Sequence, residues 1–203
     1  MAEIGAQLVK QLRDKSGAGF MECKKALVEA NGDLADAEIA LRKRGIAVAQ
    51  KKSGRAANEG VIASYIHAGS KLGVLVELNC ESDFVARTDE FQALVRDIAM
   101  HIAAADPRYT RRDEVPPADV EKERQIQKDR ALADGKPEQV VEKIVDGRMG
   151  KFYEEIVLVD QPFVKDPASS VGDLITATIA KLGENITVGR FTRFKVGENE
   201  AEG

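Results

Sequence analysis

The spacing of apolar residues changes at Glu59, and this change decides what the chain can fold into. Before Glu59, apolar side chains recur at the spacing of a helix with one buried face. After it, two β-rich runs, Val61–Ile66 and Leu72–Leu78, flank a turn that contains Gly69, a pattern typical of a β-hairpin. Because helical and β-strand patterns occupy separate segments of one chain, we expect an α+β fold.

The N-terminal segment is predicted to form three short helices. Gly17 ends the first, the second runs from about residue 20 to Ala30, and the third begins at its N-cap Asp33 and is closed by Gly45. Residues 46–58 are interpreted as a linker that is partly helical, because Ala and Lys are good helix formers. We therefore expect a first domain of three helices plus linker at residues 1–54.

Residues 55–203 are predicted to form an α+β core with a small antiparallel sheet. After the β-hairpin, Thr88 caps a helix, and two helices at about 119–156 form a helical hairpin whose polar first arm is expected to project. Ser169 or Ser170 caps a further helix, and residues 185–196 form a last strand. Because an isolated two-stranded hairpin is marginal in water, this strand must join it or helices must cover it.

Composition argues against several classes of protein. The net charge of −4 and pI near 5.4 argue against a nucleic-acid binder, which usually carries basic excess. No apolar run approaches the roughly 20 residues of a membrane helix, and the first residues resemble no targeting signal, so we expect a cytoplasmic protein. Cys23 and Cys80 are interpreted as reduced thiols and His67 and His101 as structural, so neither metal nor cofactor is expected.

No catalytic constellation is found in the sequence. Residues 17–25 differ from a phosphate-binding loop, because Cys23 precedes the lysine and no Ser or Thr follows. Glu81 and Asp83 could be a carboxylate pair, but nothing indicates the pocket that would shift their protonation. The sequence therefore favours a protein that is not an enzyme and that acts through binding at its surface.

Two apolar clusters stand in unusual places. Gly19–Met21, with Arg13, lies at the first turn between helices, either as a hydrophobic staple inside the module or as an exposed anchor for a partner. Phe84 lies in the link Cys80–Thr88, where an aromatic ring gains little on a surface. It either folds back onto the sheet, with Ser82 or Asp83 bonding nearby amides, or serves a partner.

At these clusters the chain resembles the translation elongation factor Ts family. The resemblance is carried in order by the segments "LVKQLRDKSGAGFMECKKAL", "EANGDLADAEIALRKRG", "LNCESDFVAR", "QPFVKDPASSVGDLI" and "RFTRFKVGE". It implies a guanine-nucleotide exchange factor for elongation factor Tu that binds no nucleotide itself. It also implies that residues 1–54 form a ubiquitin-associated-like domain that docks on the partner.

The resemblance also implies which residues act. The docking residues would be Arg13, Gly19, Phe20, Met21 and Lys24, and the element that enters the partner and displaces Mg²⁺ would be Ser82, Asp83, Phe84 and Val85. Phe20 stands where most members have Met, and Ser82 replaces the usual Thr but keeps the hydroxyl. The core appears once in this chain, and short members are implied to work as homodimers.

Three alternative functions stay open from the residues. The N-terminal domain could be a plain helix-binding interaction module, with the core as scaffold. RNA binding is a second alternative, which strongly salt-dependent binding would support. Catalysis is a third, which turnover without a GTPase would support.

Overall fold

A computed structural model describes residues 4–198, and its contacts divide the chain into two compact units. The first unit holds the residues up to Val61 together with Leu78–Leu94 and Leu174–Thr187. The second holds Ile62–Glu77, Val95–Asp173 and the described residues from Val188. These units describe contacts rather than independent folding, so the expected domain boundary near residue 54 stays a prediction.

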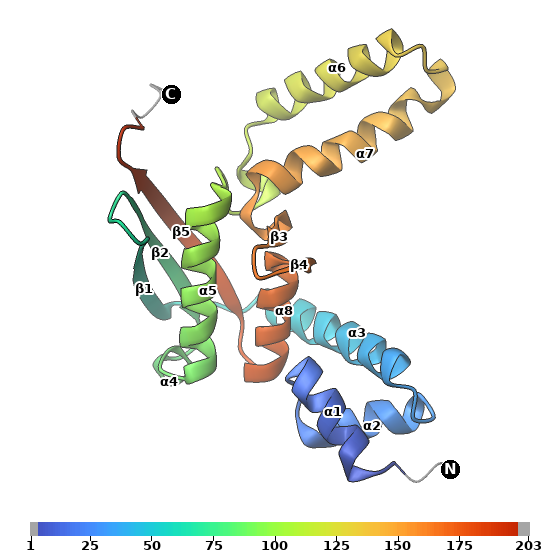
Figure 1. The fold of residues 1–203 in the computed structure, drawn as a ribbon, viewed down its shortest axis with the longest axis vertical. Coiled ribbons are helices and arrows are strands. Elements are labelled where there is room, and N and C mark those ends of the chain that lie inside the picture. Colours follow the sequence, from blue (N-terminus) through green and yellow to red (C-terminus); the bar gives the residue numbers. More distant parts are fainter. Residues whose placement is uncertain (1–3, 199–203) are drawn as a thin grey trace. The chain divides into compact units, whose positions relative to one another are not determined.

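Three packed helices form the N-terminal part of the first unit, as predicted: α1 (Ala6–Ser16), α2 (Phe20–Glu29) and α3 (Leu34–Lys52) (Figure 1). Gly17 ends α1 in the left-handed conformation, and the Asp33 side chain caps α3 by accepting from the Asp36 amide at 2.8 Å. Their shared core consists of small and medium apolar side chains, namely Val9, Leu12, Cys23, Ala26, Leu27 and Ala37.

The prediction that Gly45 closes the third helix is wrong. Helix α3 continues through Gly45 to Lys52 and so takes up half of the stretch interpreted as a linker. The following residues are good helix formers, and their preference outweighs one glycine. A Cβ atom on Gly45 would lie 3.4 Å from the Cβ of Ala180 in α8 (Val171–Leu182), so this glycine permits close helix packing within the first unit.

A three-stranded antiparallel sheet contains β1 (Glu59–Ile66), β2 (Leu72–Cys80) and β5 (Ile186–Lys195), in the order β1-β2-β5. The predicted hairpin and the joining of the last strand are both confirmed. On the central strand β2, every second side chain is buried. This alternation is expected of a sheet that is covered on one face.

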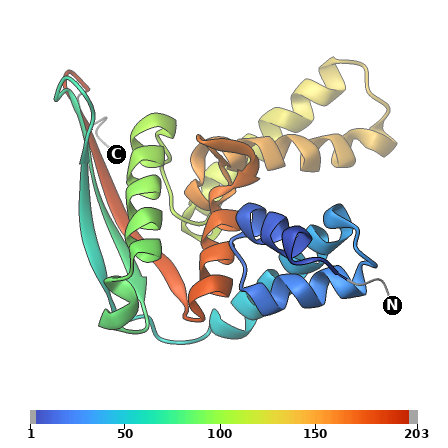
Figure 2. The ribbon, with the colours of Figure 1, turned by 60° about the horizontal axis from the view of Figure 1, so that its bottom comes forward.

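As predicted, helix α5 (Asp89–Ala105) is capped by Thr88, whose hydroxyl accepts from the Phe91 amide at 3.3 Å. Within the second unit, its C-terminal half runs along one face of the sheet, where Arg193 Nε donates to the Ala103 carbonyl at 3.3 Å (Figure 2). Several large apolar side chains on the strands of this unit, or directly after β5, are exposed instead. We call this group the open sheet face: Ile66, Leu75, Phe194 and Val196.

The predicted helical hairpin is confirmed, with α6 (Pro117–Ala133) and α7 (Glu138–Ile156) side by side (Figure 1). It has a small core of its own, formed by Ala131, Val141, Val145 and Met149. Because these side chains come from facing positions of two antiparallel helices, the hairpin is held by its own packing as well as by its connections.

The segment between α7 and α8 contains structure that the sequence did not predict. Strands β3 (Pro162–Phe163) and β4 (Asp166–Ser170) form a separate antiparallel pair there, after a short 3₁₀ helix at Leu158–Asp160. A second short 3₁₀ helix, at Arg112–Glu114, lies between α5 and α6. Ser170 caps helix α8 as predicted: its hydroxyl accepts from the Asp173 amide at 3.0 Å, while the Asp173 carboxylate accepts from the Ser170 amide at 3.1 Å.

None of the helices in residues 4–198 combines the length and the apolar character that crossing a bilayer demands.

Candidate functional site

Phe84 lies on a one-turn helix, α4 (Asp83–Ala86), where the sequence predicted only a link. Val85 and Ala86, the next two residues, are buried, whereas the Phe84 side chain is 77% exposed. Successive residues of a helical turn face different directions, so burying Val85 and Ala86 turns Phe84 outward. The interpretation in which Phe84 folds back onto the sheet is therefore wrong.

The N-terminal end of α4 is fixed by Ser82. Its hydroxyl accepts from the Val85 amide at 3.4 Å, as one sequence-based interpretation expected, and donates to the Glu184 carboxylate at 2.6 Å. Asp83 instead forms an ion pair with Arg87 at 2.8 Å, and both side chains are largely exposed. Glu184 was not foreseen from the sequence, because it lies 102 residues from Ser82 along the chain.

The N-terminal cluster also presents its large side chains to solvent. Gly19 is the extended N-cap of α2, and after it Phe20 is 47% and Met21 71% exposed. These exposures disfavour the alternative of a staple buried inside the module. Arg13 and Lys24 are exposed as well, and neither makes a side-chain bond to another of residues 4–198.

Carboxylates near α4 are engaged with cations and amides rather than with each other. Glu81 accepts from the Asn185 amide at 2.7 Å and pairs with Arg55 at 3.3 Å, and the Asn185 amide is the largest cause that lowers the pKa of Glu81. Asp83 is committed to Arg87. A shared-proton carboxylate pair is thus absent here, and no metal-holding cluster of His, Cys, Asp or Glu occurs in residues 4–198.

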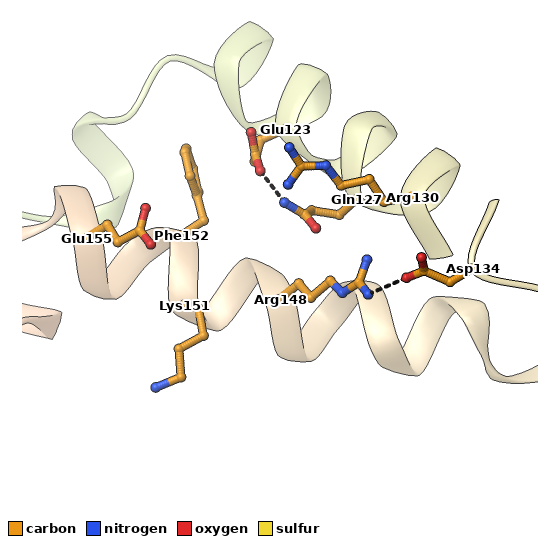
Figure 3. Close-up of a pocket in the computed structure, with 8 residues that line it drawn as sticks. All are labelled: Glu123, Gln127, Arg130, Asp134, Arg148, Lys151, Phe152 and Glu155. Atoms are coloured by element: carbon orange, nitrogen blue, oxygen red, sulfur yellow. Dashed lines mark hydrogen bonds and ion pairs between the residues drawn. The ribbon is translucent and has the colours of Figure 1, made fainter. Parts of the chain in front are cut away.

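A groove of about 370 Å³ lies between α6 and α7 (Figure 3). Side chains of both charge signs line it, and some pair with one another: Gln127 donates to Glu123 at 2.6 Å and Arg148 to Asp134 at 3.1 Å. No residue predicted as functional from the sequence lines this groove. Its paired charges are typical of a solvated helix surface.

His101 is a buried structural histidine, as expected. Its Nε2 lies 2.9 Å from the Gln161 side-chain oxygen, and its Nδ1 accepts from the Val164 amide at 3.3 Å. This network assigns the neutral ring with the proton on Nε2. Burial is the main cause that lowers the pKa of His101, and the bond to Gln161 offsets it in part.

The lowered pKa predicts that acid destabilises the protein through His101. Because the folded-state pKa of His101 lies below the unfolded value, the neutral ring favours the folded state. Its full contribution to stability is present above about pH 6.5 and is lost as pH falls through the folded pKa. Urea unfolding at pH 7.5, 6.5 and 5.5 should show this loss, with a slope of at most about 1.4 kcal/mol per pH unit from this group. His101→Gln should flatten the profile, and equal slopes in both proteins would contradict the assignment.

Comparison with known proteins gives one consistent family. The family model described as "Elongation factor TS" matches residues 4–198. A protein named elongation factor Ts from Solibacter usitatus is 64% identical over 198 residues, which covers 98% of this chain and 93% of that protein. Those from Koribacter versatilis and Carboxydothermus hydrogenoformans are 60% and 56% identical, covering 96% and 98% of this chain and 89% and 92% of the relatives.

Proposed function

The chain belongs to the elongation factor Ts family and serves translation elongation, and from this premise we propose that it is a guanine-nucleotide exchange factor for elongation factor Tu. The observation that carries the proposal is the exposure of Phe84. Phe84 is 77% exposed on a turn whose next two residues, Val85 and Ala86, are buried. A large ring that gains no burial within its own chain is suited to fill a pocket on a partner.

The proposed mechanism is mechanical and needs no bond chemistry on the nucleotide. The turn that carries Asp83 and Phe84 enters the GTPase and shifts the segments that hold its Mg²⁺. Mg²⁺ requires near-ideal octahedral geometry and neutralises the phosphate charge, so a small displacement weakens GDP binding. Ser82 and Val85 hold the turn in place, since one caps it and the other anchors it in the core.

Docking is assigned to the N-terminal helices. Phe20 and Met21 supply exposed apolar surface, while Gly19 keeps the start of α2 open to close approach. Arg13 and Lys24 supply uncommitted positive charge beside it. Such a mixture of apolar anchors and charged rim is typical of protein interfaces, and methionine adapts its shape to the partner.

Exchange follows from reciprocal coupling between the two ligands of the GTPase. If the factor weakens GDP binding, then GDP weakens binding of the factor by the same ratio. Rebinding of either nucleotide therefore expels the factor, which accelerates exchange without choosing the nucleotide. On this proposal the chain acts in the cytoplasm, is not an enzyme and contacts no nucleotide directly.

The test is release of a fluorescent GDP analogue from elongation factor Tu, followed by stopped flow. We expect the wild-type chain to accelerate release in a saturable manner. Binding to the GTPase without acceleration would instead favour the alternative function, a helix-binding interaction module. Absence of binding as well would contradict the proposed partner.

We further propose that the chain acts as a homodimer through the open sheet face. This face is apolar and holds a hollow of about 490 Å³, and Phe194 on its edge strand is 62% exposed. Contiguous exposed apolar side chains are uncommon on monomers and mark interaction surfaces. A second copy, which presents the same face, would cover it by a two-fold interface.

The dimer is expected to dissociate when charge is placed on this face. Phe194→Glu should shift sedimentation from dimer to monomer, because a buried unpaired carboxylate opposes association. Ala168→Glu, which adds the same charge at an exposed position of β4, is the matched control and should stay dimeric. A wild-type monomer at micromolar concentration would contradict the dimer proposal but not the exchange function.

A further inference from the structure

The helix that carries Phe84 is too short to hold itself in place. It has four residues, and a single helical turn is unstable in isolation because nucleation is unfavourable. Val85 and Ala86 anchor its C-terminal part in the core. Its N-terminal part therefore depends on contacts made by the residues just before it.

Glu184 supplies those contacts with a single carboxylate. One oxygen accepts from the Ser82 hydroxyl at 2.6 Å, and the other accepts from the amides of Ser82 and Glu81 at 3.0 and 3.1 Å. Hydrogen bonds to an ionised acceptor are shorter and stronger than neutral ones. Three such bonds fix both residues that lead into α4.

The contact is reciprocal, because the Glu81 carboxylate accepts from the Asn185 amide at 2.7 Å. Residues 81–82 and 184–185 thus exchange carboxylate–amide bonds. The Asn185 side chain in turn donates to the Arg55 carbonyl at 2.8 Å, which ties the segment before β1 to the same place. All these residues belong to the first unit.

Glu184 also decides how Ser82 caps the helix. A hydroxyl has one proton, and the bond to Glu184 uses it. The lone pairs of the Ser82 oxygen are then left to accept from the Val85 amide. Without Glu184, the hydroxyl is free to rotate, and the cap loses its fixed orientation.

We propose that Glu184 is a positioning residue that pre-organises Phe84 for entry into the partner. The proposal rests on the exchange function proposed above. Ordering a side chain at an interface costs free energy, so a turn already fixed in the free chain binds its pocket more strongly. The ring itself touches only the partner, and Glu184 acts through Ser82 and the α4 backbone.

The test compares Glu184→Ala with two controls in the stopped-flow release of fluorescent GDP from elongation factor Tu. We expect about a tenfold lower maximal rate, as the loss of charge-assisted bonds allows, with a half-saturating concentration changed less than about threefold. Glu184→Gln keeps one acceptor oxygen and should restore part of the rate. Glu90→Ala, which removes a carboxylate paired with Lys181 in the same unit, should leave it unchanged.

A double variant separates positioning from a general structural role. If Glu184 acts through Phe84, then Glu184→Ala should add almost nothing to the effect of Phe84→Ala, whereas independent effects would multiply. Multiplying effects, or a wild-type rate in Glu184→Ala, would overturn the proposal while leaving the exchange function intact.

Amide hydrogen exchange measures, without the partner, how firmly Glu184 fixes residues 81–85. In Glu184→Ala the amides of Glu81, Ser82 and Val85 should exchange at least about tenfold faster, while those of α2 stay unchanged. Unchanged protection at residues 81–85 would directly refute the proposal that Glu184 orders this turn. If wild type fails to accelerate GDP release, the exchange function fails by itself, and this measurement still decides whether Glu184 orders the turn.

Discussion

Phe84→Ala is expected to lower the maximal acceleration of GDP release by roughly 30-fold or more, the effect typical of removing an interface anchor worth about 2 kcal/mol. The ring is the only large group of α4 that faces solvent, so no other side chain of this turn can replace it. Stability should stay within about 0.5 kcal/mol of wild type, because exposed side chains contribute little to the free energy of unfolding.

The measurement is the release rate across a range of factor concentrations. Docking through the N-terminal helices should persist, so the half-saturating concentration of Phe84→Ala should change far less than its maximal rate. Leu132→Ala is the matched control, since it truncates another exposed apolar side chain, on α6. Wild-type release rates in Phe84→Ala would show that the Phe84 ring takes no part in exchange.

Local patterns in the sequence predicted most of the secondary structure. Asp33, Thr88 and Ser170 each cap a helix by a bond to a residue three positions ahead, so the signal lies within one turn. The strands of the β-hairpin were predicted for a similar reason, because two β-rich runs flank a short turn that contains Gly69. Interactions between near neighbours leave a recognisable spacing of residue types along the chain, and that spacing is what the predictions used.

The errors and the open alternative have different physical causes. At Gly45 the helix continues because the residues that follow are good helix formers, and their combined preference outweighs one glycine. Strand β3 has two residues, which is too few for a recognisable pattern, although its partner β4 follows in the same segment. For Phe84 a distant residue contributes, because Ser82, which caps its turn, is bonded to Glu184 102 residues away, so the sequence left both orientations open.

The candidate residues themselves came from family resemblance rather than from spacing. Exposure of Phe20, Met21 and Phe84 is what the structure adds, and it disfavours the alternatives in which these side chains are buried within the chain. Glu184 was missed because an acid before a strand carries no signal by itself. Its role emerges only when residues 81–82 and 184–185 are placed together.

Removing the apolar docking surface should have the opposite kinetic signature to removing Phe84. For Phe20→Ala combined with Met21→Ala, we expect the half-saturating concentration to rise by roughly 100-fold, since two anchors are lost at a cost of about 1–2 kcal/mol each. The maximal rate should stay within about threefold of wild type, because the turn with Phe84 is intact once the complex forms at high concentration.

Titration of the release rate separates these two effects, and binding to nucleotide-free elongation factor Tu gives the affinity independently. Val28→Ala is the matched control, because Val28 is an exposed apolar residue of the same helix outside the proposed docking set. If the double variant lowered the maximal rate without changing the affinity, then the N-terminal helices would act in the exchange step rather than in docking. The assignment of docking to Met21 and of the exchange step to Phe84 would then be wrong, even if both residues matter for exchange.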